Sequence, residues 1–377
     1  MTAQRLNIGI TGFAGAGGSG VVAGELGRLL ARRGHSVHFI ADAPPFRFPR
    51  FAELVHYHEV VVPEYPLFRH LYTLALAAKM ADVSRRFALD VLHVHYALPH
   101  TAAALLARSI LGDPRRPRLV TTLHGTDVTL VGSDPSLHEA TSLCIRSSHS
   151  VTTVSQFLKG AASTLFPGGP QIEVIPNFVD RAACSAAATV AGHSSRPAAT
   201  EEVLLVHLSN FRSIKRPVDT VRILAAVNAV RPARLLLIGD GPEIPSVLSE
   251  VERLNLRDRV QLVGNQIDVQ TLLSPCDVFL LPSAAEGFGL AALEAMACGV
   301  PAVTSDAGGL AELIENGQGG YRVAVGDIGS MAARVLDIAA DPATLQFQRA
   351  AARARAARFD AEVIIPLYEN LYMRTLA

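Results

Sequence analysis

The stretch Glu286-Gly-Phe-Gly-Leu-Ala-Ala-Leu-Glu294 places two carboxylates around a glycine-containing turn. It follows an apolar run from Val278 to Leu281 that predicts a buried strand, and a helix is expected to begin near Gly289. The backbone N–H groups at 288–290 would then point out of the helix N-terminus, which favours an anion such as a phosphate. The two carboxylates would flank that anion and accept hydrogen bonds from sugar hydroxyls. The pattern therefore favours a nucleotide-sugar site over two ordinary exposed acids.

Length, charge and cysteine content limit the classes of protein to which the chain can belong. Its 377 residues predict two domains, and 34 basic side chains balance 34 acidic ones. This balance gives no reason to expect a nucleic-acid partner or an anionic membrane surface. The sequence contains no apolar run long enough to predict a membrane-spanning helix, and the N-terminus lacks the layout of a signal peptide. Four scattered cysteines without a C-x-x-C pair favour reduced thiols in a cytoplasmic protein.

Short apolar runs alternate with longer helical patterns in both halves of the chain. This alternation predicts parallel βαβ units, with helices on both faces of each sheet. The halves meet at an Ala/Ser/Pro-rich segment, 181–202, which we interpret as a linker. The expected fold is α/β, with two Rossmann-like, doubly wound domains that face a central cleft. The predicted strands are Asn7–Ile10, Val37–Ile40, Val91–Val94, Leu119–Leu123, Val151–Val154, Glu173–Ile175, Val203–Leu208, Arg234–Ile238, Val260–Val263, Val278–Leu281 and Ala302–Thr304.

A glycine-rich loop, Gly15-Ala-Gly-Gly-Ser-Gly20, follows the first strand and opens the first helix. Glycines let a backbone approach a ligand closely, so Gly17 and Gly18 are candidates for contact with a diphosphate. The loop also matches G-x-G-x-x-G, with Asp42 at the end of the second strand. A nicotinamide-dependent oxidoreductase is therefore an alternative function. Ser19 has two possible roles, as a ligand-binding residue or as the helix N-cap.

A basic loop, Ser209-Asn-Phe-Arg-Ser-Ile-Lys-Arg-Pro217, follows the first strand of the second half. Arg212 and Lys215 could neutralise a pyrophosphate that leaves during a transfer reaction. The alternative is a solvated surface loop.

Histidines cluster in His93-Val-His-Tyr-Ala-Leu-Pro-His100 and in His124-Gly-Thr-Asp127. A metal site is disfavoured because no acidic or cysteine partner has ligand spacing, so no metal is expected. His124 ends a predicted strand, where it could hydrogen-bond a sugar hydroxyl.

Taken together, these segments resemble the retaining glycosyltransferases of family 4, which have the GT-B fold. In that family, the acids that match Glu286 and Glu294 contact the donor sugar and the ribose diol. The basic loop resembles the family's Arg-x4-Lys phosphate clamp, with Asn210 in the place of the usual arginine and Arg212 expected to supply its charge. The resemblance implies no cofactor. It also implies a final helix, 361–377, that packs back on domain 1–178, with domain 179–360 binding the donor.

Further segments resemble one subfamily, which moves GlcNAc from UDP-GlcNAc to the hydroxyl of L-malate in the first step of bacillithiol biosynthesis. They include Pro45-Phe-Arg47, Gly132-Ser-Asp-Pro-Ser136 and Ser209-Asn-Phe-Arg212. The implied products are GlcNAc-α-malate and UDP, with retained anomeric configuration. A transferase acting on an inositol phosphate or a lipid and a UDP-sugar epimerase stay as alternatives, and a homo-oligomer stays open.

The site residues expected from these motifs fall into three groups. The catalytic candidates are His124, Arg212, Lys215 and Glu286. The donor-binding candidates are Gly17, Gly18, Asn210, Gly241, Asn265, Gln266, Gly287, Phe288, Gly289, Leu290 and Glu294. The acceptor-binding candidates are Ser19, Arg47, Tyr96 and Thr122.

Overall fold

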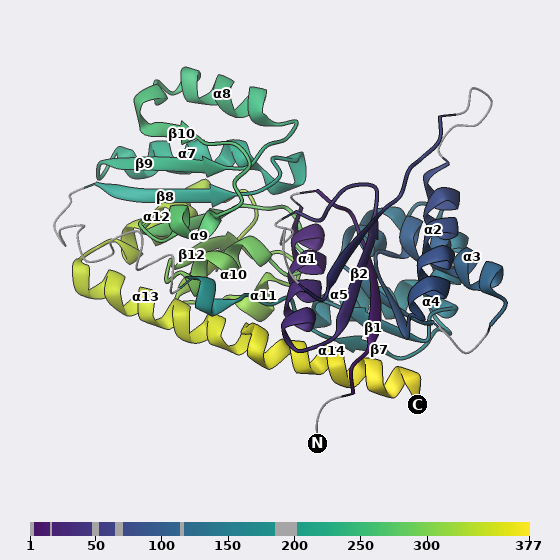
Figure 1. The fold of residues 1–377 in the computed structure, drawn as a ribbon. Coiled ribbons are helices and arrows are strands. Elements are labelled where there is room, and N and C mark those ends of the chain that lie inside the picture. The colour runs from purple at the N-terminus through teal and green to yellow at the C-terminus, as the bar shows by residue number, and fades with distance from the viewer. Residues whose placement is uncertain (1–3, 16, 47–52, 65–70, 114–116, 185–201) are drawn as a thin grey trace. The chain divides into compact units, whose positions relative to one another are not determined.

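The computed structural model describes residues 4–15, 17–46, 53–64, 71–113, 117–184 and 202–377, and Figure 1 traces its helices and strands. The chain divides into two compact units. Unit 1 comprises residues 1–176 and 364–377, and unit 2 comprises residues 177–363. The expected domain boundary, after residue 178, lies two residues from the observed one.

Unit 1 is built on a parallel sheet. Within the described residues this sheet has seven strands, in the order β3-β2-β1-β4-β5-β6-β7. The order reverses between the neighbours β1 and β4, which is the doubly wound arrangement that the sequence predicts. The strands are β1 Asn7–Thr11, β2 Ser36–Ala41, β3 Val55–Glu59, β4 Val91–His95, β5 Arg118–Leu123, β6 Ser150–Thr153 and β7 Ile172–Val174.

Helices connect the strands of unit 1 and complete its core. Those described are α1 Gly18–Arg32, α2 Tyr72–Phe87, η1 Ala97–Thr101, α3 Ala102–Leu111, η2 Asp127–Val131, α4 His138–Arg146 and α5 Gln156–Leu165. The apolar faces of α2 and α3 pack on the central strands. Leu76 and Met80 of α2, together with Ala104 of α3, lie fully buried in a cluster with Leu92 of β4.

Unit 2 has a second parallel sheet, whose described part contains six strands in the order β10-β9-β8-β11-β12-β13. Here the order reverses between β8 and β11. The strands are β8 Val203–Leu208, β9 Ala233–Ile238, β10 Val260–Leu262, β11 Val278–Leu281, β12 Ala302–Ser305 and β13 Gly320–Val323. Its described helices include η3 Ser213–Lys215, α7 Pro217–Asn228, α8 Ile244–Arg253, η4 Arg257–Arg259, α9 Val269–Leu273, α10 Leu290–Ala297, α11 Leu310–Leu313, α12 Ile328–Ile338, α13 Pro342–Ala356 and η5 Ala357–Phe359. The last helix, α14 Ala361–Leu376, begins in unit 2 and belongs to unit 1 from residue 364.

The last helix, α14, returns to unit 1 for most of its length. The hydroxyl of Tyr372 lies 2.7 Å from Nδ1 of His93 in β4. Arg33 donates to Glu369 at 2.8 Å and 2.9 Å. Unit 1 is thus completed by the last residues of the chain, so its core requires a segment that follows unit 2 in sequence.

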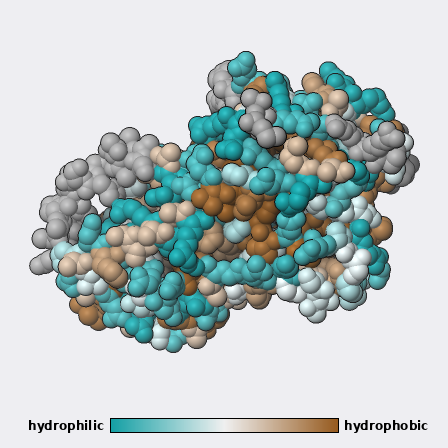
Figure 2. All heavy atoms as spheres, turned by 90° about the horizontal axis from the view of Figure 1, so that it is seen from below, coloured by the Kyte–Doolittle hydropathy of each residue, from teal (hydrophilic) through white to brown (hydrophobic). Residues whose placement is uncertain are grey.

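Among the described residues, no helix is long and apolar enough to cross a membrane. On the face shown in Figure 2, hydrophilic residues cover much of the surface and apolar residues gather in smaller groups between them. The four cysteines are buried and form no disulfide.

Candidate active site

The site in unit 2 begins at the two strands where the sheet order reverses. Loop 209–216 follows β8, and loop 282–289 follows the neighbouring strand β11. The backbone N–H of Ala284 donates to the carbonyl oxygen of Ile214 at 2.8 Å, which ties the two loops together. Open α/β sheets bind ligands at this position, outside the carboxyl ends of the strands.

Lys215 and Glu286 meet across these loops. The Lys215 ammonium nitrogen lies 2.6 Å from Oε1 of Glu286, and the hydroxyl of Ser283 donates to the same oxygen at 2.8 Å. The Lys215 side chain is 23% exposed and that of Glu286 is 9% exposed. Arg212 is exposed, and within the described part of the chain its guanidinium has no partner. The loops therefore present one cation that is already ordered and one that is available to an anion.

The turn between Glu286 and α10 depends on glycine. Gly289 is the N-cap of α10 and has a φ of 97°, and an added Cβ there would collide with the Leu310 side chain. The helix begins at Leu290, one residue after the predicted start. The ring of Phe288 is buried and packs edge-on against Phe359 at 5.3 Å. The first N–H groups of the helix have no partner within the helix itself, as at every helix N-terminus.

Glu294 lies inside unit 2 rather than on its surface. The residue is only 6% exposed, in the middle of α10. The alternative of an ordinary exposed helix acid is therefore wrong.

Three further donor-binding candidates of unit 2 lie in the loops that follow β9 and β10, namely Gly241, Asn265 and Gln266. A Cβ at Gly241 would collide with the carbonyl oxygen of Asn210, so only glycine lets these two loops approach. Gln266 donates to the carbonyl oxygen of Val263 at 2.6 Å, while Asn265 is exposed. Oδ1 of Asn210 is buried and makes no hydrogen bond within the described residues.

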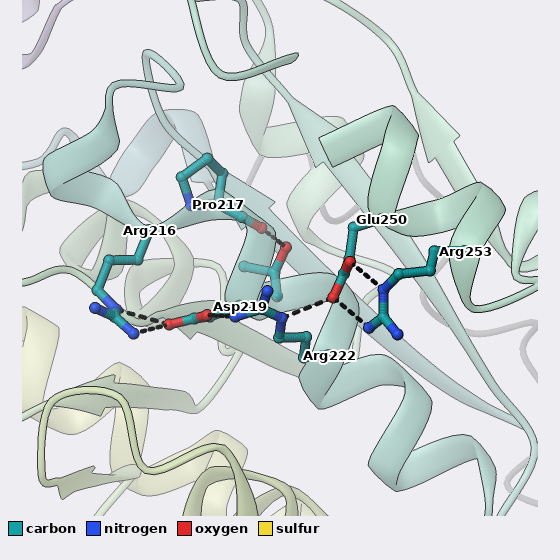
Figure 3. A network of polar contacts seen from close by, with 7 residues as sticks. Arg216, Pro217, Asp219, Arg222, Glu250 and Arg253 are labelled. Carbon is teal, nitrogen blue, oxygen red and sulfur yellow. Dashed lines mark hydrogen bonds and ion pairs between the residues drawn. The ribbon is translucent and has the colours of Figure 1, made fainter. Parts of the chain in front are cut away.

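An ion-pair network fixes the end of the basic loop (Figure 3). Arg216 donates to Asp219 at 2.6 Å, and Arg222 reaches both Asp219 and Glu250. Arg253 donates twice to Glu250, at 2.7 Å and 2.8 Å. The hydrogen bonds from Arg253 and Arg222 lower the pKa of Glu250 to about 2. Because Arg216 directly follows Lys215, the network anchors the backbone beside that lysine.

In unit 1, His124 and Tyr96 lie together at the ends of β5 and β4. Their ring centroids are 5.4 Å apart. Asp127 accepts from the backbone N–H of His124 at 3.1 Å, and Nε2 of His124 lies 2.8 Å from Nδ1 of His95. Burial lowers the pKa of His124 to about 3, so its ring is neutral near pH 7, and burial raises the pKa of Asp127 to about 6. Tyr96 has a φ of 83°, a strained conformation that is most common at functional sites.

Thr122 does not lie on the surface of this site. It is fully buried, and its hydroxyl oxygen lies 2.7 Å from Nε2 of His93 and 2.6 Å from the hydroxyl of Thr152. A direct contact with an acceptor would require these buried hydrogen bonds to be exchanged. Thr122 instead links β5 to its neighbours β4 and β6.

The glycine-rich loop leads into α1, whose N-cap is Gly17. The N-cap alternative for Ser19 is therefore wrong, because Ser19 lies inside the first turn and is half-buried. Gly18 is exposed, and an added Cβ at Gly17 would meet open space. Arg47, the fourth acceptor candidate, lies outside the described residues.

The histidines of β4 bond within unit 1 rather than forming a set of metal ligands. In the part of the chain that the structure describes, no group of three His, Cys, Asp or Glu side chains is arranged to hold a metal ion. The rings of His93 and His95 stack at 4.6 Å, and His100 bonds through Nδ1 to the carbonyl oxygen of His95 at 2.6 Å.

Sequence reasoning did not find Ser283, His207 and Ser209. Ser283 bonds Glu286 directly, and the other two support the basic loop. The only sequence signal for them is their position at the ends of β8 and β11.

Two doubly wound parallel sheets, with a Lys–Glu pair and a glycine-capped helix at the reversal point of the second, match what is expected of a glycosyltransferase of the GT-B fold. The chain matches the family model "Glycosyltransferase Family 4" over residues 16–183 and the model "Glycosyl transferases group 1" over residues 202–341. It is 41% identical to N-acetyl-alpha-D-glucosaminyl L-malate synthase of Bacillus anthracis, over 99% of this chain and 98% of that protein. The chain belongs to glycosyltransferase family 4, in the group that contains this synthase.

Solved structures share the fold at lower sequence identity. Sucrose-phosphate synthase from Thermosynechococcus elongatus superposes with a TM-score of 0.80 at 22% identity, covering 98% of this chain and 99% of that one. Anabaena HepE, solved in complex with UDP and glucose, superposes with a TM-score of 0.77 at 22% identity, covering 98% of this chain and all of that one.

Proposed function

We propose that this glycosyltransferase moves GlcNAc from UDP-GlcNAc to the hydroxyl of L-malate, giving GlcNAc-α-malate and UDP. The observation that carries the proposal is the 41% identity, over 99% of the chain, to a protein named for the synthesis of that product. The site supports it, because loops 209–216 and 282–289 bring cations and Glu286 together beside the N-terminus of α10, the helix that contains Glu294. The donor is assigned to unit 2 and the acceptor to unit 1.

In the proposed reaction, the malate hydroxyl oxygen bonds to the anomeric carbon on the face from which UDP departs. The bond between that carbon and the β-phosphate oxygen breaks, and the hydroxyl proton passes to the departing phosphate. The configuration at the anomeric carbon is therefore retained. No enzymic nucleophile is required, so the protein acts by positioning and by stabilising charge.

Negative charge grows on the diphosphate as the sugar leaves. Lys215 has three N–H donors and uses one on Glu286, which leaves two for phosphate oxygens. Arg212 is exposed at the same loop, and the N-terminus of α10 adds backbone donors. We propose that these groups stabilise the leaving group without a metal ion.

Glu286 and Glu294 are proposed to hold the two sugars of the donor. Oε1 of Glu286 is occupied by Lys215 and Ser283, whereas Oε2 has no partner among the described residues. Oε2 is therefore available to a hydroxyl of GlcNAc. Glu294 is assigned to the ribose diol.

The decisive experiment measures UDP release from UDP-GlcNAc, with and without L-malate. Release that requires malate is the expected result, and the proton coupling at the anomeric carbon of the product should report an α-linkage. Better turnover with an inositol phosphate than with malate would reject the acceptor assignment.

Equal rates with and without EDTA are expected from a metal-independent reaction.

A further inference from the structure

The backbone conformation of the basic loop depends on contacts with residues outside the loop. It carries Asn210, Arg212 and Lys215, yet its only regular element is the short helix η3. Phe211 and Arg216 have φ angles of 41° and 49°, a conformation that is costly for residues with bulky side chains. Contacts from outside the loop must therefore hold this backbone in place.

His207, in β8, makes the first such contact. Its side chain is fully buried, and Nδ1 lies 2.9 Å from the carbonyl oxygen of Leu280 in β11. A carbonyl oxygen only accepts hydrogen bonds, so Nδ1 must carry the ring hydrogen. The backbone pairing of β8 with β11 reaches Val206 and Phe279, so the imidazole joins the two strands just beyond that pairing.

The other ring nitrogen of His207 reaches into the loop. Nε2 lies 2.8 Å from the hydroxyl of Ser209, and the Ser209 oxygen accepts from the backbone N–H of Phe211 at 3.1 Å. Burial lowers the pKa of His207 to about 4, so the ring is neutral near pH 7 and Nε2 accepts. The donor of each hydrogen bond is then fixed. Phe211 donates to Ser209, Ser209 donates to His207, and His207 donates to Leu280.

We propose that His207 is a positioning residue for the transfer reaction, acting through Ser209 on the backbone of Phe211; this inference rests on the proposed function. Phe211 stands between Asn210 and Arg212, so its conformation sets the direction of both neighbours. Its carbonyl oxygen is held as well, by the backbone N–H of Glu243 at 2.9 Å. The buried Phe211 ring contacts the His207 ring edge-on, with centroids 5.6 Å apart.

Three variants separate the two bonds of His207. His207→Asn keeps a donor near the position of Nδ1 and loses the acceptor for Ser209. His207→Gln keeps an acceptor near the position of Nε2 and loses the bond to Leu280. Ser209→Ala removes the hydroxyl that joins His207 to the loop. We expect kcat for UDP release to fall about tenfold or more in His207→Asn and in Ser209→Ala, and less in His207→Gln.

Two further properties distinguish positioning from a general loss of structure. The KM for malate should stay within about twofold, because the acceptor is assigned to unit 1. The double variant His207→Asn/Ser209→Ala should lose no more activity than the worse single variant, because both changes break one chain of bonds. Additive losses of activity in a folded double variant would overturn the inference. A wild-type kcat in His207→Asn and Ser209→Ala would also overturn it.

A binding measurement tests the same inference without any acceptor. The ratio of the dissociation constants for UMP and UDP reports how much the second phosphate adds to affinity. We expect this ratio to fall severalfold in His207→Asn and Ser209→Ala, with UMP affinity unchanged and His207→Gln closer to the wild type. If the wild type releases no UDP with malate, only the substrate assignment fails, and this ratio still decides the role of His207. An unchanged ratio in Ser209→Ala, with a wild-type melting temperature, would reject it.

Discussion

The ammonium of Lys215 lies 2.6 Å from Oε1 of Glu286, although 71 residues separate them in the sequence. Each follows one of the two adjacent strands at which the sheet order reverses. Ser283 completes the arrangement by donating to the same carboxylate oxygen at 2.8 Å. The lysine is therefore ordered before any substrate binds, and less conformational entropy is lost when it meets a phosphate.

Removal of the Lys215 ammonium should slow catalysis more than it weakens binding. The charge that Lys215 is proposed to stabilise grows as the glycosidic bond breaks, so Lys215→Ala should lower kcat by roughly 100-fold, with a smaller change in KM for UDP-GlcNAc. Steady-state kinetics with UDP release as the readout would measure both. Lys159→Ala, in α5 of unit 1, is the matched control. A Lys215→Ala enzyme with near-normal kcat would refute this role.

Glu294 should determine nucleotide affinity. If its buried carboxylate accepts from both ribose hydroxyls, Glu294→Ala removes charge-assisted hydrogen bonds worth about 1.5–3 kcal/mol, so UDP affinity should fall at least about tenfold. Calorimetric titration with UDP would measure the loss. Glu252→Ala, on the exposed side of α8, should bind UDP like the wild type. Unchanged UDP affinity in Glu294→Ala would reject the ribose assignment.

Glu286 should affect the sugar more than the nucleotide. Glu286→Gln keeps the shape of the side chain but removes the charge that pairs with Lys215 and is proposed to hold a GlcNAc hydroxyl. Turnover of UDP-GlcNAc should therefore fall by about tenfold or more, while UDP affinity changes less. Equal losses in the two measurements would argue against separate roles for Glu286 and Glu294.

The sequence predicted the central strands well because they are buried on both faces. The bounds of β8 and β11 match the predicted Val203–Leu208 and Val278–Leu281, since apolar runs are typical of such strands. The sequence did not predict β3 and β13, which lie at sheet edges. Their segments, VHYHE and GYRV, lack a continuous apolar run, so their pairing depends on a neighbouring strand rather than on local composition.

Site residues in the loops that follow strands could be predicted from the sequence. Residues whose role depends on how they are buried inside a strand were harder to predict. Lys215 and Glu286 could be named from their loops, but their ion pair depends on strand order. Thr122 lies in a strand whose residues are buried on both faces, so period-two alternation gives no signal for the direction of its hydroxyl. His207 also lies inside an apolar strand, so the sequence pattern gives no signal for the direction of its ring.

The acceptor assignment predicts a selective effect at Tyr96. Tyr96→Phe removes one neutral hydroxyl from a ring that packs against His124, so the KM for malate should rise about fivefold while UDP affinity stays nearly intact. Kinetics at saturating UDP-GlcNAc would give the KM, and calorimetry would give the UDP affinity. Loss of UDP affinity with an unchanged KM for malate would mean that the acceptor pocket is misplaced.

Thr122 should instead contribute to stability. Thr122→Val keeps the volume of the side chain but leaves the buried groups of His93 and Thr152 without this partner. The free energy of unfolding should fall by about 1–3 kcal/mol, as expected when a buried polar group loses its hydrogen bond. Chemical denaturation would measure it. A wild-type stability combined with a large rise in the KM for malate would restore Thr122 to the acceptor site.

Acid should destabilise the protein through the buried His93 and His100 and the partly buried His124 of unit 1. Burial lowers the pKa of His93 and His124 to about 3 and that of His100 to about 4, from an ordinary value of 6.5. The neutral rings therefore contribute stability that is fully present above pH 6.5 and is lost as the pH falls towards 4, because only the unfolded chain takes up the protons. Each such histidine lowers the free energy of unfolding by about 1.4 kcal/mol per pH unit below its unfolded pKa.

Asp127 should oppose this trend in part. Burial raises its pKa from 3.8 to about 6, so the folded protein binds this proton first as the pH falls from 6 to 4. Three histidines outweigh one such carboxyl, so the free energy of unfolding, measured with urea, should still drop steeply between pH 7 and pH 5. His124→Asn should reduce that slope by about 1.4 kcal/mol per pH unit, because one of the titrating groups is gone. Equal stability of the wild type at pH 7 and pH 5 would show that these rings are protonated in the folded chain.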